Sequence, residues 1–157
     1  MDERARRLIG RLKLEPHPEG GYYREIYRSA AIVRPDDDRI ERSAATTIYY
    51  MLVEGQQSRW HRVRSDEIWH FYGGDPLDLF LTPPTLDRVE QVVLDAAHPV
   101  HVVPRYWWQA TRPTGSYGLA GCTVAPGFEF EDFSLIADDA EALDILRRRH
   151  PHLTSLV

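Results

Sequence analysis

The chain has 157 residues, of which 43% are hydrophobic and 27% are charged, and its formal net charge is −5. This length suits one domain with a proper core over residues 1–157, and the acidic balance argues against a nucleic-acid partner. No apolar run approaches the ~20 residues of a membrane span, and the single cysteine, Cys122, permits no internal disulfide, so we expect a cytoplasmic protein with no membrane partner.

The first third of the chain predicts a helix followed by strands. Apolar residues recur at helical spacing over residues 2–12 behind Asp2, which predicts a short amphipathic helix with Asp2 as its cap. Prolines and glycines in residues 14–21 end that helix. Residues 22–28 then predict a strand rich in aromatic side chains, and residues 43–53 predict a long strand.

The rest of the chain alternates short strands with tight turns, and no helix separates the strands. The predicted strands cover residues 59–63, 67–72, 77–82, 89–94, 101–103, 109–111 and 117–124. This pattern indicates a closed or sandwiched antiparallel barrel. A helix is predicted from residue 138 to the proline at 151, with acids in its first turn and arginines in its last.

Residues 55–74 carry the most informative motif. Gly55, His61, Glu67 and Gly74 have the spacing of the first motif of the cupin barrels, Gly-x5-His-x-His-x3-Glu-x6-Gly, with Val63 in the place of the second histidine. A weaker block at residues 104–109 resembles the cupin turn Pro-x-Gly-x-x-His. There, Tyr106 takes the glycine place and Gln109 the histidine place.

These motifs and their surroundings resemble the Cupin-five family of small single-domain cupins. The residues that carry the resemblance are 14–29, 46–50, 60–70 and 121–133. The resemblance implies an all-β fold, a double-stranded β-helix or jelly-roll barrel with short N- and C-terminal helices. It also implies a homodimer with a ligand pocket in the barrel mouth, and it implies no particular reaction.

A more distant likeness concerns residues 19–25, Glu-Gly-Gly-Tyr-Tyr-Arg-Glu. They are similar to the Arg-Gly-Phe-Phe-x-Glu segment of the deoxythymidine-diphosphate-sugar 3,5-epimerases, metal-free cupins that bind nucleotide-sugars. Tyr22 and Tyr23 stand in the aromatic places and Glu25 in the acidic place, while Gly20 replaces the arginine. The likeness implies that this segment helps to bind the ligand and that a histidine on a following strand removes a proton.

His61 and Glu67 are the predicted catalytic residues. Strand alternation places His61 and Val63 on one face, and the resemblance to the cupins implies that this is the inner face of the barrel. There His61 is either a general base or a packed core histidine. A buried glutamate is costly without a partner, so Glu67 either serves the site, or turns outward, or pairs with Arg64 in a structural ion pair. The short turn between the two predicts neighbouring antiparallel strands with both side chains in one cavity.

Further candidates are predicted to bind the ligand. Buried tyrosine and tryptophan need partners for their polar ends, and they suit a pocket for a flat or sugar-like molecule. His17 in the entry loop fits a loop role as well as a ligand contact. The predicted ligand-binding residues are Tyr23, Glu25, Tyr50, Trp108 and Gln109.

We expect no metal and no other cofactor, because His61, Glu67 and Gln109 provide only two good ligands and one weak one. The leading interpretation is a metal-independent epimerase or isomerase for a small carbohydrate-like or nucleotide-like molecule, with a dimer contact through residues 22–27. The alternatives are a non-catalytic cupin that binds or senses a small ligand, and a metal-dependent cupin oxygenase or isomerase.

Overall fold

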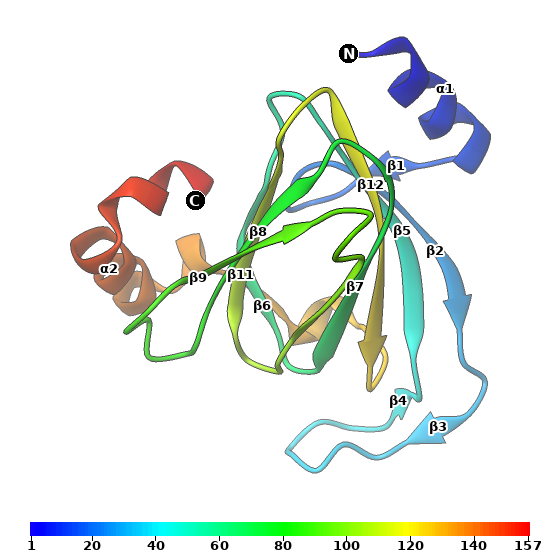
Figure 1. The fold of residues 1–157 in the computed structure, drawn as a ribbon. Coiled ribbons are helices and arrows are strands. Elements are labelled where there is room, and N and C mark those ends of the chain that lie inside the picture. Colours follow the sequence, from blue (N-terminus) through cyan, green and yellow to red (C-terminus); the bar gives the residue numbers. More distant parts are fainter.

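The computed structural model describes residues 1–157, and most of them form two antiparallel sheets that face each other (Figure 1). The larger sheet contains, in spatial order, β1 (Glu15–Pro16), β2 (Tyr22–Arg28), β5 (Thr46–Val53), β12 (Tyr117–Ala125), β7 (Asp66–Gly74) and β10 (Val100–Val103). The smaller sheet contains β13 (Phe133–Leu135), β6 (Ser58–Val63), β11 (Trp108–Pro113), β8 (Leu77–Thr82) and β9 (Glu90–Leu94). The strands curve around a shared interior, which makes a barrel.

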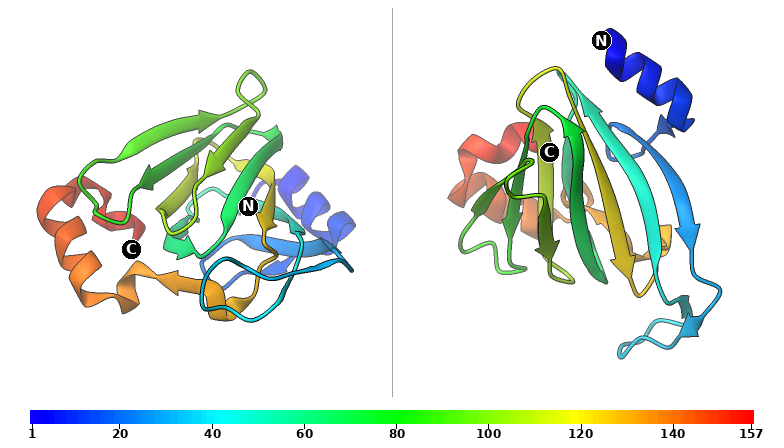
Figure 2. Two further views of the ribbon diagram at one scale, coloured as in Figure 1. Left: turned by 90° about the horizontal axis from the view of Figure 1, so that it is seen from below. Right: turned by 45° about the vertical axis from the view of Figure 1, so that its right-hand side comes forward.

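Helices cover the outside of the barrel at two places (Figures 1 and 2). Helix α1 (Glu3–Leu12) begins at Asp2, whose carboxylate accepts a hydrogen bond from the Arg4 amide at 2.8 Å, and it packs over Met51 and Val53 on the outer face of β5. Helix α2 (Ala140–Arg149) is capped by Asp139 and covers the outer face of the smaller sheet. Short 3₁₀ turns, η2 (Ile136–Asp138) and η3 (Pro151–Leu156), flank α2.

A small hairpin of β3 (Ile32–Val33) and β4 (Arg42–Ser43) projects from one end of the barrel (Figure 2). Buried ion pairs connect this hairpin to η1 (Phe130–Asp132). Asp132 accepts two hydrogen bonds from Arg42, at 2.9 and 3.0 Å, and one from Arg39 at 3.3 Å. All three residues are buried, so these contacts fix the segment that leads into β13.

Strand alternation divides the hydrophobic residues between two cores. Inward-facing side chains such as Tyr50, Leu52 and Trp69 fill the barrel. Outward-facing side chains of the smaller sheet, including Trp60 and Trp108, pack beneath α2 and η3. Each fully buried large side chain contributes about 1.5–3 kcal/mol to stability, so the C-terminal helix is an integral part of the packing.

The all-β barrel with short terminal helices that the sequence predicts is confirmed. Most strand predictions match within one or two residues, and the alternation over residues 46–52 is also right. The strand predicted at residues 43–53 is two strands, because β4 pairs with β3 before β5 begins. No helix is both long enough and apolar enough to cross a membrane.

One topological prediction is wrong: β6 and β7 are not paired neighbours. Strand β6 pairs with β11 and β13 in the smaller sheet, whereas β7 pairs with β12 and β10 in the larger one. The connection between them crosses from one sheet to the other, as it does in jelly rolls, where successive strands change sheets. His61 and Glu67 therefore approach one another from opposite walls of the barrel.

Candidate functional site

A cavity of about 230 Å³ opens between the two sheets. Its walls come from β2, β5, β6, β7 and β12, together with the entry segment before β2 and the segment that contains η1 and β13. The cavity combines aromatic side chains with buried ionisable ones. Its ionisable groups with little exposure are His17, Glu19, Tyr50, His61, Glu67 and Cys122.

The centre of the site is a carboxyl–imidazole pair formed by Glu19 and His61. Nδ1 of His61 lies 2.8 Å from the Arg59 carbonyl oxygen, which can only accept, so Nδ1 carries a proton. Nε2 of His61 lies 3.2 Å from Oε2 of Glu19. A neutral imidazole with its proton on Nδ1 has a lone pair on Nε2, so one proton is shared between Glu19 and His61.

Burial decides where that shared proton resides. Both side chains are at most 8% exposed. Desolvation raises the pKa of Glu19 and lowers the pKa of His61, because each charged form loses its water. Both shifts favour a neutral pair in which the protonated Glu19 carboxyl donates to Nε2. The pair can release or accept a proton when a ligand changes its surroundings.

The entry segment positions Glu19 by backbone contacts. Gly20 and Gly21 have φ angles of 113° and 74°, and a Cβ at Gly20 would collide with the Gln57 carbonyl oxygen. The Tyr50 hydroxyl donates to the Gly20 carbonyl at 2.8 Å, and the Ser58 hydroxyl donates to Oε1 of Glu19 at 2.9 Å. This double-glycine turn holds the Glu19 carboxyl in the barrel, against β6.

Glu67 is held on the opposite sheet by a chain of hydrogen bonds. The Trp69 indole N–H, which can only donate, lies 2.8 Å from Oε1 of Gln109. This contact fixes the amide orientation, so Nε2 of Gln109 donates to Oε2 of Glu67 at 2.5 Å. Desolvation, together with the nearby Glu19, raises the pKa of Glu67, while His61 and Gln109 act in the opposite direction.

Two further side chains complete the surroundings of the pair. The Phe133 ring stacks on His61, with centroids 5.4 Å apart. The Glu19 amide donates to Nδ1 of His17 at 3.2 Å, so a neutral His17 carries its proton on Nε2. Burial lowers the pKa of His17, which favours this neutral form. His17 is thus a hydrogen-bond donor in the cavity wall.

Five of the predicted site residues line the cavity. His61 and Glu67 face it from opposite walls, and Tyr23 and Tyr50 line it from β2 and β5. Glu25 lies at the exposed mouth, where it accepts two hydrogen bonds from Arg28.

The other two predicted ligand contacts lie elsewhere. Gln109 is buried behind Glu67 and orients it. The prediction that Trp108 lines the pocket is wrong. Trp108 precedes the inward-facing Gln109, so it points outward into the core beneath α2, with the Arg62 guanidinium 4.3 Å from its ring centroid.

Sequence reasoning missed Glu19 as a site residue and left His17 undecided. Both lie in an irregular segment, where no strand period shows the direction of a side chain. The available signal was the pair of glycines at positions 20 and 21, which directly follow Glu19 and come shortly after His17, itself placed between two prolines. Such glycines mark a turn that brings the backbone close to another strand.

The side chains present do not fit the metal centre of a three-histidine cupin. The structure contains no group of three or more His, Cys, Asp or Glu side chains placed to hold a metal ion. Val63 provides no ligand, Nε2 of His61 faces Glu19, and Gln109 is bonded to Glu67 and Trp69. The polar side chains of this site contact one another: His61 contacts Glu19, and Gln109 contacts Glu67 and Trp69.

Comparison with known proteins identifies the family of this chain. The sequence model of one protein family, Cupin_5 of the cupin superfamily (DUF985), matches residues 6–136. The chain belongs to the Cupin_5 family. No curated protein matches the chain significantly.

Two solved structures resemble this Cupin_5 chain over nearly its full length. A hypothetical protein from Leishmania major is 29% identical with a TM-score of 0.84, and the match covers 98% of this chain and 96% of the other. A protein from Shewanella oneidensis is 31% identical with a TM-score of 0.81, and the match covers 98% and 94%. The capsular polysaccharide assembling protein CapF from Staphylococcus aureus shares the fold alone, at 9% identity and a TM-score of 0.60 over 78% of this chain and 31% of CapF.

Proposed function

We propose that this Cupin_5 protein is a metal-independent isomerase or epimerase that moves a proton at a carbon next to a carbonyl group in a small ligand. One observation carries the proposal: two separately held proton carriers face the same cavity from opposite sheets. One is the Glu19–His61 pair and the other is Glu67. Perturbed acids and bases that converge on a cavity are typical of active sites.

The chemistry follows from the protonation states. In the proposed reaction Nε2 of His61 gives up its contact with Glu19 when the ligand enters and takes a proton from the ligand carbon, and the electrons of the C–H bond pass to the carbonyl oxygen to form an enolate. The Nε2–H of His17 can donate a hydrogen bond to that oxygen and stabilise its negative charge while keeping the proton. Glu67, whose raised pKa favours the protonated acid, returns a proton to carbon from the other side. The product differs from the substrate in configuration or in the position of the carbonyl group.

The cavity volume supports a small ligand. At about 230 Å³ it lies below the roughly 300–1,000 Å³ of pockets for drug-sized molecules. A monosaccharide-sized compound suits this space, whereas the greater part of a nucleotide-sugar would lie outside it. We therefore favour the carbohydrate-like ligand over the nucleotide-like one.

The test is exchange with solvent deuterium. The protein is incubated in D₂O with a panel of small aldoses, ketoses and amino-substituted carbonyl compounds, and each compound is followed by proton NMR. We expect deuterium to enter next to the carbonyl of at least one compound, and we expect His61→Asn and Glu19→Gln each to abolish this exchange. Exchange that is unchanged in both variants would refute the proposal.

The same panel separates the proposal from a binding or sensing role. A compound that binds to the wild-type protein but never exchanges its protons would identify a non-catalytic cupin. Trp108→Phe serves as the control, because Trp108 is buried outside the cavity. This variant is expected to keep the exchange rate of the wild-type protein.

A further inference from the structure

We propose that the cavity selects a small ligand with one cationic nitrogen, such as an amino sugar or an amino ketone, and rejects phosphate and carboxylate ligands. This inference rests on the proposed function only in taking the same cavity as the site. Three independent features of the lining support it: the balance of charges, the arrangement of aromatic rings and the partners of the buried carboxyl groups.

The lining is rich in carboxyl groups and poor in available cations. Five glutamates contribute to the cavity and only two arginines, and no lysine does. Of the five N–H donors of Arg28, four are already engaged: two with Glu25, one with Glu129 and one with the Phe128 carbonyl, at 2.8 to 3.0 Å. The other arginine, Arg24, is exposed at the mouth. The interior therefore has no guanidinium that could bind a phosphate group.

The two buried carboxyl groups have only neutral partners. Glu19 is bonded to Ser58 and His61, and Glu67 is bonded to Gln109. A buried carboxylate without a cationic partner is unfavourable, which is why burial raises the pKa of both groups. A ligand ammonium group would stabilise the charged form of such a carboxyl group, which then releases its proton, whereas an anionic ligand would make that charged form still less favourable.

Three phenyl rings form a corner in the wall of the cavity. The planes of Phe128 and Phe130 meet at 82°, those of Phe130 and Phe133 at 74°, and those of Phe128 and Phe133 at 69°. Their centroids are 5.1 to 6.5 Å apart, and all three rings line the cavity. Nearly perpendicular rings have the shape of the aromatic cages that bind ammonium groups, because the electron-rich face of a ring attracts a cation.

The experiment compares two probes that differ only in charge. Choline and 3,3-dimethylbutan-1-ol have nearly the same shape, but only choline is cationic. Binding is measured by isothermal titration calorimetry with the full chain, and inorganic phosphate is added as a competitor. We expect choline to bind at millimolar concentration, about tenfold or more tightly than the alcohol. We expect phosphate neither to bind nor to compete.

A pair of variants tests the aromatic corner. Phe130→Leu keeps an apolar side chain but removes the ring face, and Tyr72→Leu is the matched control. The two aromatic residues are 52% and 50% exposed, but Tyr72 lies outside the cavity. Phe130→Leu should weaken choline binding by about threefold while leaving alcohol binding unchanged, as expected for one half-exposed cation–π contact. The control should change neither.

Each contrary outcome overturns the inference. The inference fails if choline does not bind, if the alcohol binds as tightly as choline, or if phosphate displaces choline. Failure of the proposed function is visible separately in the deuterium exchange. Selective cation binding without exchange leaves the inference intact and refutes catalysis, whereas exchange confined to neutral compounds supports catalysis and refutes the inference.

Discussion

The buried carboxyl of Glu67 makes a specific prediction about stability and pH. Its ordinary pKa is 4.5, and burial, with Glu19 nearby, raises it in the folded protein. The folded state therefore binds this proton more tightly than the unfolded chain does. The contribution of Glu67 to the free energy of unfolding is most favourable below pH 4.5 and declines as pH rises through the folded-state pKa. Glu67→Gln removes this decline while keeping an oxygen that can accept from Gln109.

The magnitude follows from the linkage relation. Each unit by which the pKa is raised corresponds to about 1.4 kcal/mol of unfolding free energy. In a domain of this size, 1 kcal/mol shifts the melting temperature by about 2–4 °C. Glu67→Gln should therefore have nearly the wild-type melting temperature at acidic pH and become the more stable protein at pH 8. The expected gain is about 3–6 °C for each unit of raised pKa.

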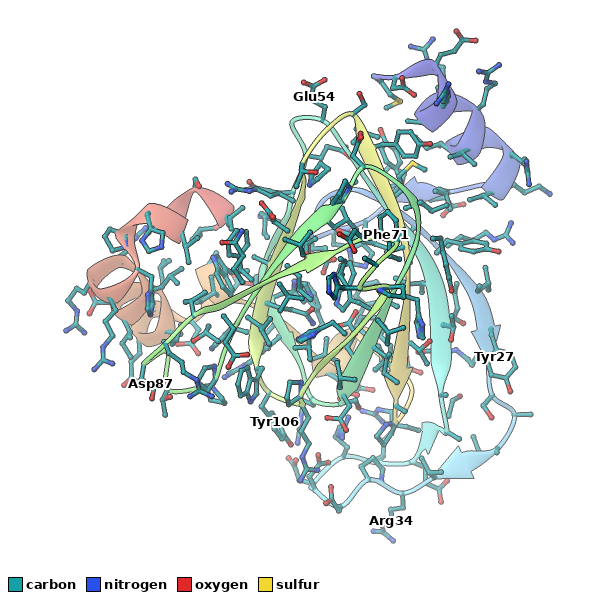
Figure 3. All side chains as sticks on the ribbon, viewed as in Figure 1. Tyr27, Arg34, Glu54, Phe71, Asp87 and Tyr106 are labelled. Atoms are coloured by element: carbon teal, nitrogen blue, oxygen red, sulfur yellow. The ribbon has the colours of Figure 1, made fainter.

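The assay is thermal unfolding followed by circular dichroism at closely spaced pH values. The control is Glu54→Gln, because Glu54 is exposed at the turn between β5 and β6 and points away from the barrel (Figure 3). The neighbours that titrate with Glu67, namely Glu19, His61 and Cys122, are the same in both variants. A difference between Glu67→Gln and wild type that stays constant or decreases as pH rises would refute the argument.

Three other predictions concern different parts of the molecule. Asp132→Asn should lower the unfolding free energy, measured by urea titration, by about 3 kcal/mol or more, because two buried arginines lose their charge partner. The surface control Asp144→Asn should lower the unfolding free energy by less than about 1 kcal/mol. Light scattering should show a homodimer at micromolar concentration, because residues 24–28 of β2 form an open sheet edge on which Tyr27 points outward (Figure 3). Tyr27→Lys should weaken this dimer. Elemental analysis of protein purified without metal-affinity resin should find no stoichiometric transition metal, and about one retained metal ion per chain would contradict this prediction.

The sequence predicts the strands well because one face of most strands is buried. A period of two along β5 and β6 identifies the inward positions, and the motif spacing places His61 and Glu67 among them. The same period could have excluded Trp108, since adjacent residues of a strand cannot both face inward when Gln109 does. The need of buried tryptophan for a polar partner favoured a pocket role for Trp108, but the alternation of β11 directs its side chain outward.

The sequence could not predict the positions of side chains that depend on contacts between segments far apart in the chain. The sequence distance between His61 and Glu67 suggests paired strands, but only the complete barrel shows that their connection crosses between sheets. Glu19 reaches His61 because Gly20 packs against Gln57, just before β6, and Gly21 packs against Met51 and Leu52 of β5. No local pattern encodes such a contact.

The residues that replace the cupin metal ligands suggest how this site differs from a metal centre. His61 keeps its motif position, but its Nε2 faces the Glu19 carboxyl of the entry segment at 3.2 Å. Gln109 stands in the place of a histidine ligand and holds Glu67 by a fixed hydrogen bond. A proton shared by Glu19 and His61 thus links two different segments of the chain, as a metal ion bound by ligands from both segments would. The pair that fixes the entry segment is therefore the same pair to which we assign the acid and base chemistry proposed for the cavity.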